Sequence, residues 1–242
     1  MSMMPIATEE MVLALAKTGV LFGHRKSKTH PKMRPFISGI KNEIVLLDPD
    51  AVLAGIVRAG AFLRDKMSKG GLILFVGTTP SARPGIKTIA QEFSFPYVVS
   101  RWLGGTLTNF KVVHSRLQHY EELRAKRDQG ELVKYTKKEQ LGFSVEIGKL
   151  SKLFDGLATL TRLPDAIVVI DIASHAAAVR EARRLSIPVV GIVDSDDDPS
   201  TIAFPIIAND HAKSSIDWVL NELREALAEG KAAQVAVATN EN

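Results

Sequence analysis

The stretch LPDAIVVIDIASHAAAVREARRLSIPVVGIVD, residues 163–194, decides the fold class because a helical segment separates two apolar runs in it. The runs Ala166–Asp171 and Pro188–Asp194 are rich in Val and Ile and show no alternation of polar and apolar residues. Such runs are typical of strands that are buried on both faces of a parallel sheet. Ser174 can cap a helix over about 174–186. The stretch therefore predicts a strand–helix–strand unit.

The same alternation of strands and helices extends toward the N-terminus. Asp48 and Pro49 read as a helix cap followed by a proline in the first turn, and Gly70-Gly71 as the end of that helix. The predicted fold class is α/β, with a mostly parallel sheet and helices on both faces. We expect further strands at Ile44–Asp48, Leu72–Gly77 and Pro96–Val99, and further helices over about 49–68, 81–93 and 210–229.

A different pattern interrupts this domain between about 103 and 160. Apolar residues recur at helical spacing from Phe110 to Tyr120 and again from Phe143 to Leu157, with a break at Gln129-Gly130. Two such seams joined by a turn predict a protruding antiparallel coiled-coil hairpin. We therefore expect a discontinuous α/β domain over 1–102 and 161–229 with a helical hairpin insertion at 103–160. Residues 230–242 lack a capped amphipathic pattern, so we expect a disordered tail there.

Composition excludes several classes of protein. The chain has 242 residues, and because 45% of them are hydrophobic, intrinsic disorder is excluded as the main state. The sequence has no cysteine, which excludes a disulfide scaffold, a thiolate zinc site and cysteine catalysis. The longest uncharged stretch, Gly70–Ala82, is too short for a membrane span, and the first residues do not resemble a signal peptide. We expect a soluble cytoplasmic protein without a membrane partner.

Charge is distributed unevenly along the chain. The net charge is +9 over residues 1–120 and −7 over residues 163–242, although the whole chain carries only +4. Two windows, 11–42 and 93–120, contain no acidic residue. Ordinary solvated surfaces mix both signs, whereas Lys or Arg on a phosphate gains free energy by releasing counterions. The pattern favours a phosphate-binding surface over a basic surface that serves solubility, and the acidic third is expected to face a basic protein neighbour.

Two segments carry the predicted contacts with RNA. GHRKSKTHPKMRPF, residues 23–36, interleaves cations with Gly, Pro and His, which favours a shaped surface loop. RWLGGTLTNFK, residues 101–111, places a Trp beside an Arg, and both can stack on unpaired bases. The alternative for Trp102 is that it anchors the hairpin base to the core. The candidate RNA-binding residues are His24, Arg25, Lys26, Lys28, His30, Lys32, Arg34, Arg101, Trp102, Asn109 and Lys111.

The alternative function is an α/β enzyme or binding protein for a nucleotide or sugar phosphate. Its candidate loop, residues 75–85, has neither the G-x-G-x-x-G nor the G-K-[ST] pattern, although Arg83 could meet a phosphate. Asp194–Pro199 resembles the start of a calcium loop, but Pro199 stands where the required Gly should be, so a turn is the simpler interpretation. The histidines lack metal-ligand spacing. We predict no catalytic residue, metal, cofactor or small-molecule substrate.

Several blocks together resemble one family. These blocks are GVLFGH (19–24), HPKMRPFI (30–37), KGGLILFVGT (69–78), PYVVSRWLGGTLTNF (96–110), LPDAIVVID (163–171) and EARRLSIPVVGIVDSDDDP (181–199). From about residue 10 to 230 the chain resembles the second protein of the small ribosomal subunit, in its bacterial form. The resemblance implies an α/β domain with a protruding helical hairpin, no catalytic activity, and late binding to small-subunit ribosomal RNA between head and body.

The resemblance also implies partners and sites. It implies contacts with other small-subunit proteins and, in bacteria, help in recruiting the large messenger-binding protein one. RNA contacts in the family come from the loop after the first helix and from the hairpin base. In this sequence these correspond to His24–Arg34 and Arg101–Lys111.

Overall fold

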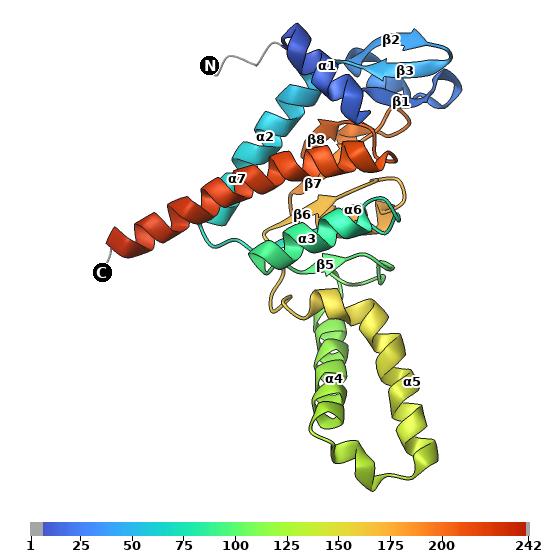
Figure 1. Ribbon diagram of the computed structural model, residues 1–242, viewed down its shortest axis with the longest axis vertical. Helices are drawn as coiled ribbons and strands as arrows, with labels where there is room; N and C mark the ends of the chain where they lie inside the picture. The colour runs from blue at the N-terminus through green and yellow to red at the C-terminus, as the bar shows by residue number, and fades with distance from the viewer. Residues whose placement is uncertain (1–6, 241–242) are drawn as a thin grey trace.

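A computed structural model describes residues 7–240, which form an α/β body from which a helical hairpin projects (Figure 1). The body contains a five-stranded sheet in the order β5-β4-β6-β7-β8, and every neighbouring pair in it is parallel. This sheet confirms the predicted α/β fold class. Its strands are β4 (Ile73–Val76), β5 (Tyr97–Val98), β6 (Ala166–Val169), β7 (Val189–Val193) and β8 (Phe204–Ile207).

Helices cover both faces of the parallel sheet. One face packs against α1 (Glu9–Thr18), α2 (Pro49–Ser68), α3 (Arg83–Phe93) and α7 (Lys213–Asn240). The other face packs against α6 (Ala176–Arg184) and the base of the hairpin. Strands β4, β6 and β7 are buried along their whole length because side chains of both faces enter a core. None of the described helices has the length and apolar character that crossing a bilayer requires.

The prediction that Ile44–Asp48 belongs to the parallel sheet is wrong. Strand β3 (Ile44–Leu47) lies in a separate antiparallel sheet, between β1 (Phe22–Arg25) and β2 (Ile37–Lys41). Only one face of β3 is covered, since Val45 and Leu47 are buried while Ile44 is exposed. A run of four apolar residues is too short to separate this pattern from a strand that is buried on both faces.

The hairpin consists of α4 (Phe110–Asp128) and α5 (Lys137–Phe154), joined through a short 3-10 turn at Glu131–Lys134. Val113, Leu117 and Tyr120 of α4 are buried in one core with Ile147 and Phe154 of α5. Both helices lie within residues 103–160, where the two apolar seams predict them. Figure 1 shows the hairpin projecting from the end of the body that lies beside β5.

The hairpin is fixed closely to the body. Gly156, which follows α5, packs directly on β5, where a Cβ at this position would lie 2.2 Å from the carbonyl oxygen of Tyr97. Only glycine permits so close an approach of two backbones. Leu157 and Leu160 are buried just beyond it. The exit from the hairpin therefore belongs to the rigid core of the body.

Helix α7 is longer than the sequence pattern indicates. It continues through Asn240, whereas the pattern predicts a helix ending near residue 229 and a disordered tail from 230. The structure therefore differs from that prediction up to residue 240, and residues 241–242 lie outside the described residues. The Ala-rich segment after Gly230 has good helix propensity, and a helix that is already formed needs no new cap in order to extend.

Candidate nucleic-acid interface

The first predicted site, residues 24–34, which we call the basic segment, begins in the last two residues of β1 and continues through a 3-10 helix, Lys26–Lys28, into a second one, Pro31–Phe36. Most of its cations are exposed. Within the part of the chain that the structure describes, four of them have no ion-pair partner. These four are Arg25, Lys26, Lys28 and Arg34.

Lys32 and His30 instead tie the basic segment to the body. The Lys32 ammonium lies 2.7 Å from Oδ2 of Asp198 and 2.6 Å from Oγ of Ser200. The hydrogen bond from Lys32 lowers the pKa of the Asp198 carboxyl. The backbone N–H of His30 donates to the carbonyl oxygen of Ser195, and Nδ1 of His30 accepts from the N–H of Lys32. The segment is thus held over the carboxyl end of β7.

His24 points inward rather than toward solvent. A Cβ on Gly23 would lie 2.7 Å from Oγ of Ser195, so glycine allows this part of the chain to approach the body. The N–H of His24 donates to the same oxygen at 2.7 Å. Its Nδ1 lies 3.1 Å from Oδ2 of Asp194 and 3.2 Å from Oδ1 of Asp196. The structure therefore gives His24 contacts with carboxylates of the body, and its contact with RNA stays a prediction.

His24, Asp194 and His211 form the group among the described residues whose side chains could hold a metal ion. Their donor atoms lie within 4.8 Å of one another, and two imidazoles with one carboxylate suit zinc. Nδ1 of His24 and Oδ2 of Asp194 are buried without a well-formed hydrogen bond. Sequence spacing could not reveal this group because His24 lies in β1, whereas Asp194 and His211 follow β7 and β8.

Further carboxylates surround this group. Burial and then the charge of Asp210 raise the pKa of Asp197 to about 7. Burial and then the charge of Asp194 raise the pKa of Asp210 to about 6. Burial also raises the pKa of Asp194. Burial lowers the pKa of His211, but the hydrogen bond and charge of Asp210 outweigh it and leave that pKa above its ordinary value. The carboxyl ends of β6, β7 and β8 thus hold closely spaced acids.

The second predicted site, residues 101–111, which we call the hairpin base, is organised by Glu181 of α6. One carboxylate oxygen accepts from the indole N–H of Trp102 at 3.0 Å and from the N–H of Gly105 at 2.8 Å. The other accepts from the N–H groups of Leu107 and Thr108 at 3.0 and 3.1 Å. Burial raises the pKa of Glu181, but these hydrogen bonds outweigh it and hold the pKa below its ordinary value.

Trp102 therefore has the anchoring role that is the alternative to base stacking. Its indole N–H is bound to Glu181, and its half-buried ring packs against the core. Arg101, Asn109 and Lys111 are exposed. Asn109 precedes α4 without a side-chain cap to it, so its amide is available to a ligand. Arg101 and Lys111 have no ion-pair partner within residues 7–240.

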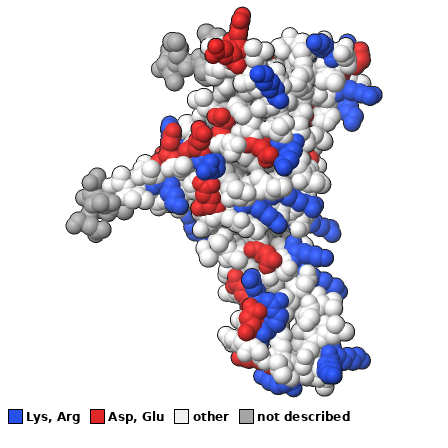
Figure 2. All heavy atoms as spheres, in the orientation of Figure 1, with Lys and Arg blue, Asp and Glu red and all other residues white. Residues whose placement is uncertain are grey.

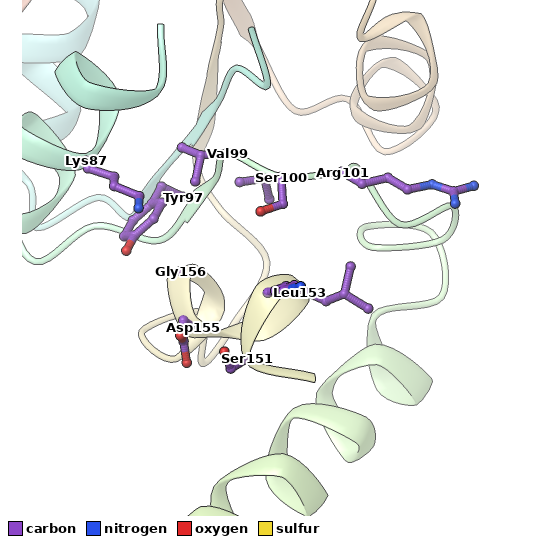
Figure 3. Close-up of a pocket in the computed structure, with 11 residues that line it drawn as sticks. Lys87, Tyr97, Val99, Ser100, Arg101, Ser151, Leu153, Asp155 and Gly156 are labelled. Carbon is purple, nitrogen blue, oxygen red and sulfur yellow. The ribbon is translucent and has the colours of Figure 1, made fainter. Parts of the chain in front are cut away.

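A hollow of about 260 Å³ lies beside the hairpin base, between the end of α5 and the region of β5 and α3 (Figure 3). In Figure 3 the amine of Lys87 lies beside the Tyr97 ring, Ser100 and Ser151 face the hollow, and Arg101 extends away from it. Lys87 of α3 and Lys152 of α5 also line it, and both are exposed. Sequence reasoning missed these two lysines because each stands among ordinary helical surface residues. Folding adds them to the cations of the hairpin base.

A buried histidine occupies the place in the sheet where an α/β enzyme would bind its ligand. Strand order reverses between β4 and β6, and ligands of such sheets bind beyond the carboxyl ends of the strands at that point. There, Nε2 of the buried His175 accepts from the N–H of Thr78 at 3.2 Å, and Nδ1 lies 2.7 Å from the carbonyl oxygen of Asp171. The N–H of Thr78, which could otherwise meet a phosphate, is therefore already bound by the buried imidazole of His175.

Charge is distributed unevenly over the surface, although some Lys and Arg side chains lie among the acids over α7. Figure 2 shows acidic side chains gathered over α7 and α1, while Lys and Arg side chains gather at the β1–β3 sheet and along the edge beside the hairpin base. Both candidate RNA-binding segments lie in the basic regions. The geometry thus provides two exposed cationic loops on a rigid body, an arrangement that suits a phosphate backbone.

Comparison with known proteins agrees with this geometry. A family model described as "Ribosomal protein S2" matches residues 15–230. A protein of Rhodopirellula baltica named "Small ribosomal subunit protein uS2" is 41% identical over 92% of this chain and 85% of its own length. Proteins of the same name from Coprothermobacter proteolyticus and Mycobacterium leprae are 37% and 39% identical, over 94% and 89% of this chain and 85% and 78% of their own lengths. The chain belongs to the ribosomal protein S2 family.

Proposed function

We propose that this protein is a structural constituent of the small ribosomal subunit, where it binds small-subunit ribosomal RNA through the basic segment and the hairpin base. The proposal includes contacts with other small-subunit proteins, among them the large messenger-binding protein one, and a cytoplasmic location. As a member of the ribosomal protein S2 family, the chain is a structural protein and not an enzyme. Its relatives carry the name of a small-subunit protein, which supports this role in translation.

The exposed, unpaired cations of the two segments are the observation that carries the RNA-binding part of the proposal. In the basic segment they are Arg25, Lys26, Lys28 and Arg34, and in the hairpin base they are Arg101 and Lys111. A cation that has no carboxylate partner keeps its full charge for a phosphate, and each such contact strengthens binding in a salt-dependent way. Both loops are braced by the body, so their cations are displayed in a defined arrangement.

Sedimentation tests the proposal directly. A tagged copy of the full chain is expressed in cells, and the lysate is separated on a sucrose gradient at moderate salt. We expect the chain to migrate with the small subunit. The variant R25E/K26E/K28E should migrate there in smaller amount, because reversal of three exposed charges repels phosphates. The control R58E/R64E/K69E reverses the same number of exposed charges on α2 and at its end, where Arg64 and Lys69 already pair with Glu229 and Asp65, and should migrate as the unchanged chain does.

The possible results distinguish an error in the proposed function from an error in the proposed RNA-binding segment. A chain that stays at the top of the gradient would overturn the proposed function. Migration of R25E/K26E/K28E that equals that of the unchanged chain would keep the function and overturn the role of the basic segment. If the α2 control migrates with the small subunit in an equally reduced amount, association depends on the total charge of the chain and not on the position of the cations.

A further inference from the structure

Between the two candidate segments, α6 borders a second hollow, of about 310 Å³. Its floor is apolar and includes Ile172, Ala176 and Val179, and the more exposed Arg180, Arg183 and Asp198 form its rim. A concave apolar surface open to solvent has a free-energy cost in an isolated protein, and such surfaces mark contact sites. The segment that forms α6 lies in the acidic third of the chain, so the sequence did not predict a cationic site there.

The free charge at the hollow is positive. Arg180 and Arg183 are exposed and have no ion-pair partner among the described residues. Two carboxylates also line the hollow: Asp198 pairs with Lys32 at 2.7 Å, and Asp197 is buried and accepts from the N–H of Asp194 at 3.3 Å. An incoming anion would therefore meet two unpaired guanidinium groups beside an apolar floor.

The hollow connects the two candidate segments. Lys32, which pairs with Asp198 on its rim, belongs to the basic segment. Glu181, which follows Arg180 in α6, binds the hairpin base through Trp102. One strand that contacts both segments would thus pass over α6 between them.

We propose that this hollow receives one unpaired nucleotide of the RNA that the two segments bind, with its base on the apolar floor and with Arg180 and Arg183 on the adjoining phosphates. The inference rests on the proposed function and adds a third contact to it. Unpaired bases stack on apolar side chains and on guanidinium planes, whereas a duplex could not enter a hollow of this size. The other occupant that these charges would fit is an acidic peptide of a neighbouring protein, and the experiment below distinguishes it.

The test measures binding of the full chain to a transcript of the small-subunit ribosomal RNA without other proteins, over a series of salt concentrations. We expect R180A/R183A to bind about tenfold more weakly at moderate salt. Its plot of log affinity against log salt should be less steep by roughly 1.4 to 1.8, the loss of two phosphate contacts. The control R58A/R64A removes two exposed arginines from α2 on the opposite face and should change neither quantity. Both variants are first checked by thermal melting for an unchanged fold.

A second readout reports on the base itself. Chemical probing should reveal an unpaired nucleotide that the unchanged chain protects and R180A/R183A leaves reactive. The variant R180K/R183K, which keeps both charges, should retain the salt dependence and lose part of the protection, because an ammonium group does not hold a phosphate through two parallel hydrogen bonds as a guanidinium does.

Each other result overturns the inference. If the unchanged chain binds the RNA and R180A/R183A binds it equally, no nucleotide occupies the hollow while the proposed function stands. If R180A/R183A binds naked RNA normally but joins the small subunit poorly, the occupant is a protein. If the unchanged chain neither binds the RNA nor joins the subunit, the proposed function itself fails.

Discussion

The basic segment and the hairpin base both display exposed cations on a loop, but the body holds the two loops in different ways. Many separate contacts hold the basic segment, among them the Lys32–Asp198 pair and the backbone bond of His30 to Ser195. The hydrogen bonds from the hairpin base to the body, in contrast, converge on a single carboxylate, that of Glu181. The loss of one side chain should therefore have a small effect on the first loop and a large effect on the second.

Replacement of Glu181 by alanine should give the largest effect. The N–H groups of Trp102, Gly105, Leu107 and Thr108 would lose their acceptor. Hydrogen bonds to a charged group contribute roughly 1.5–3 kcal/mol each but are not additive when they share one residue, so we expect the free energy of unfolding to fall by about 3 kcal/mol. Urea denaturation measures the change, and E121A, on the exposed face of α4, is the control. A loss below about 1 kcal/mol would contradict the central role of Glu181.

The dependence of the free energy of unfolding on pH tests the same role of Glu181. The folded-state pKa of Glu181 lies below its ordinary value of 4.5, so its carboxylate stabilises the folded state above about that pH. This contribution is lost as the pH falls through the folded-state pKa. We expect the unchanged chain to be more stable than E181Q by an amount that is constant between pH 7 and about 5 and shrinks below about 4.5. Urea denaturation at each pH measures it, and an advantage that grows toward low pH would contradict the assignment.

Replacement of Lys32 should give the smallest effect. Exposed ion pairs contribute between about 0 and 1 kcal/mol, so we expect K32A to lower the free energy of unfolding by less than about 0.5 kcal/mol. Because Asp198 already neutralises Lys32, its removal should also weaken RNA binding less than removal of the unpaired Lys28. Comparison of K32A with K28A in the same RNA-binding assay checks this order. A larger loss of RNA affinity for K32A than for K28A would show that RNA displaces Asp198 from Lys32.

The sequence predicted those helices and strands that are determined by residues close to one another along the chain. The strand–helix–strand unit at 163–194 and the helix that begins after Asp48 are present because apolar runs and caps act within a few residues. The hairpin follows from apolar seams within each helix. β8 was not predicted because its run is short and contains Pro205, which is tolerated there since β8 is an edge strand.

The candidate site was only partly predictable for the same reason. Runs of Lys and Arg mark the two loops in the sequence, and folding leaves most of these cations exposed. The inward turn of His24 depends on Asp194, and the anchoring of Trp102 depends on Glu181, each far away in sequence. The first pair joins β1 of the antiparallel sheet to the end of β7, and the second joins the segment after β5 to α6, so each pair forms only in the complete tertiary fold. Residue type and spacing therefore identify the loops but not the orientation of their side chains.

The close packing of Gly156 on Tyr97 has a mechanical consequence. Helix α4 has 19 residues and is therefore roughly 28 Å long, so the hairpin acts as a lever whose fulcrum lies at this contact. By simple geometry, a tilt of about 5° at the fulcrum would displace the far end by roughly 2.5 Å over that length. That displacement approaches the length of a hydrogen bond. The lack of a side chain at residue 156 therefore determines the position of the hairpin tip relative to the body.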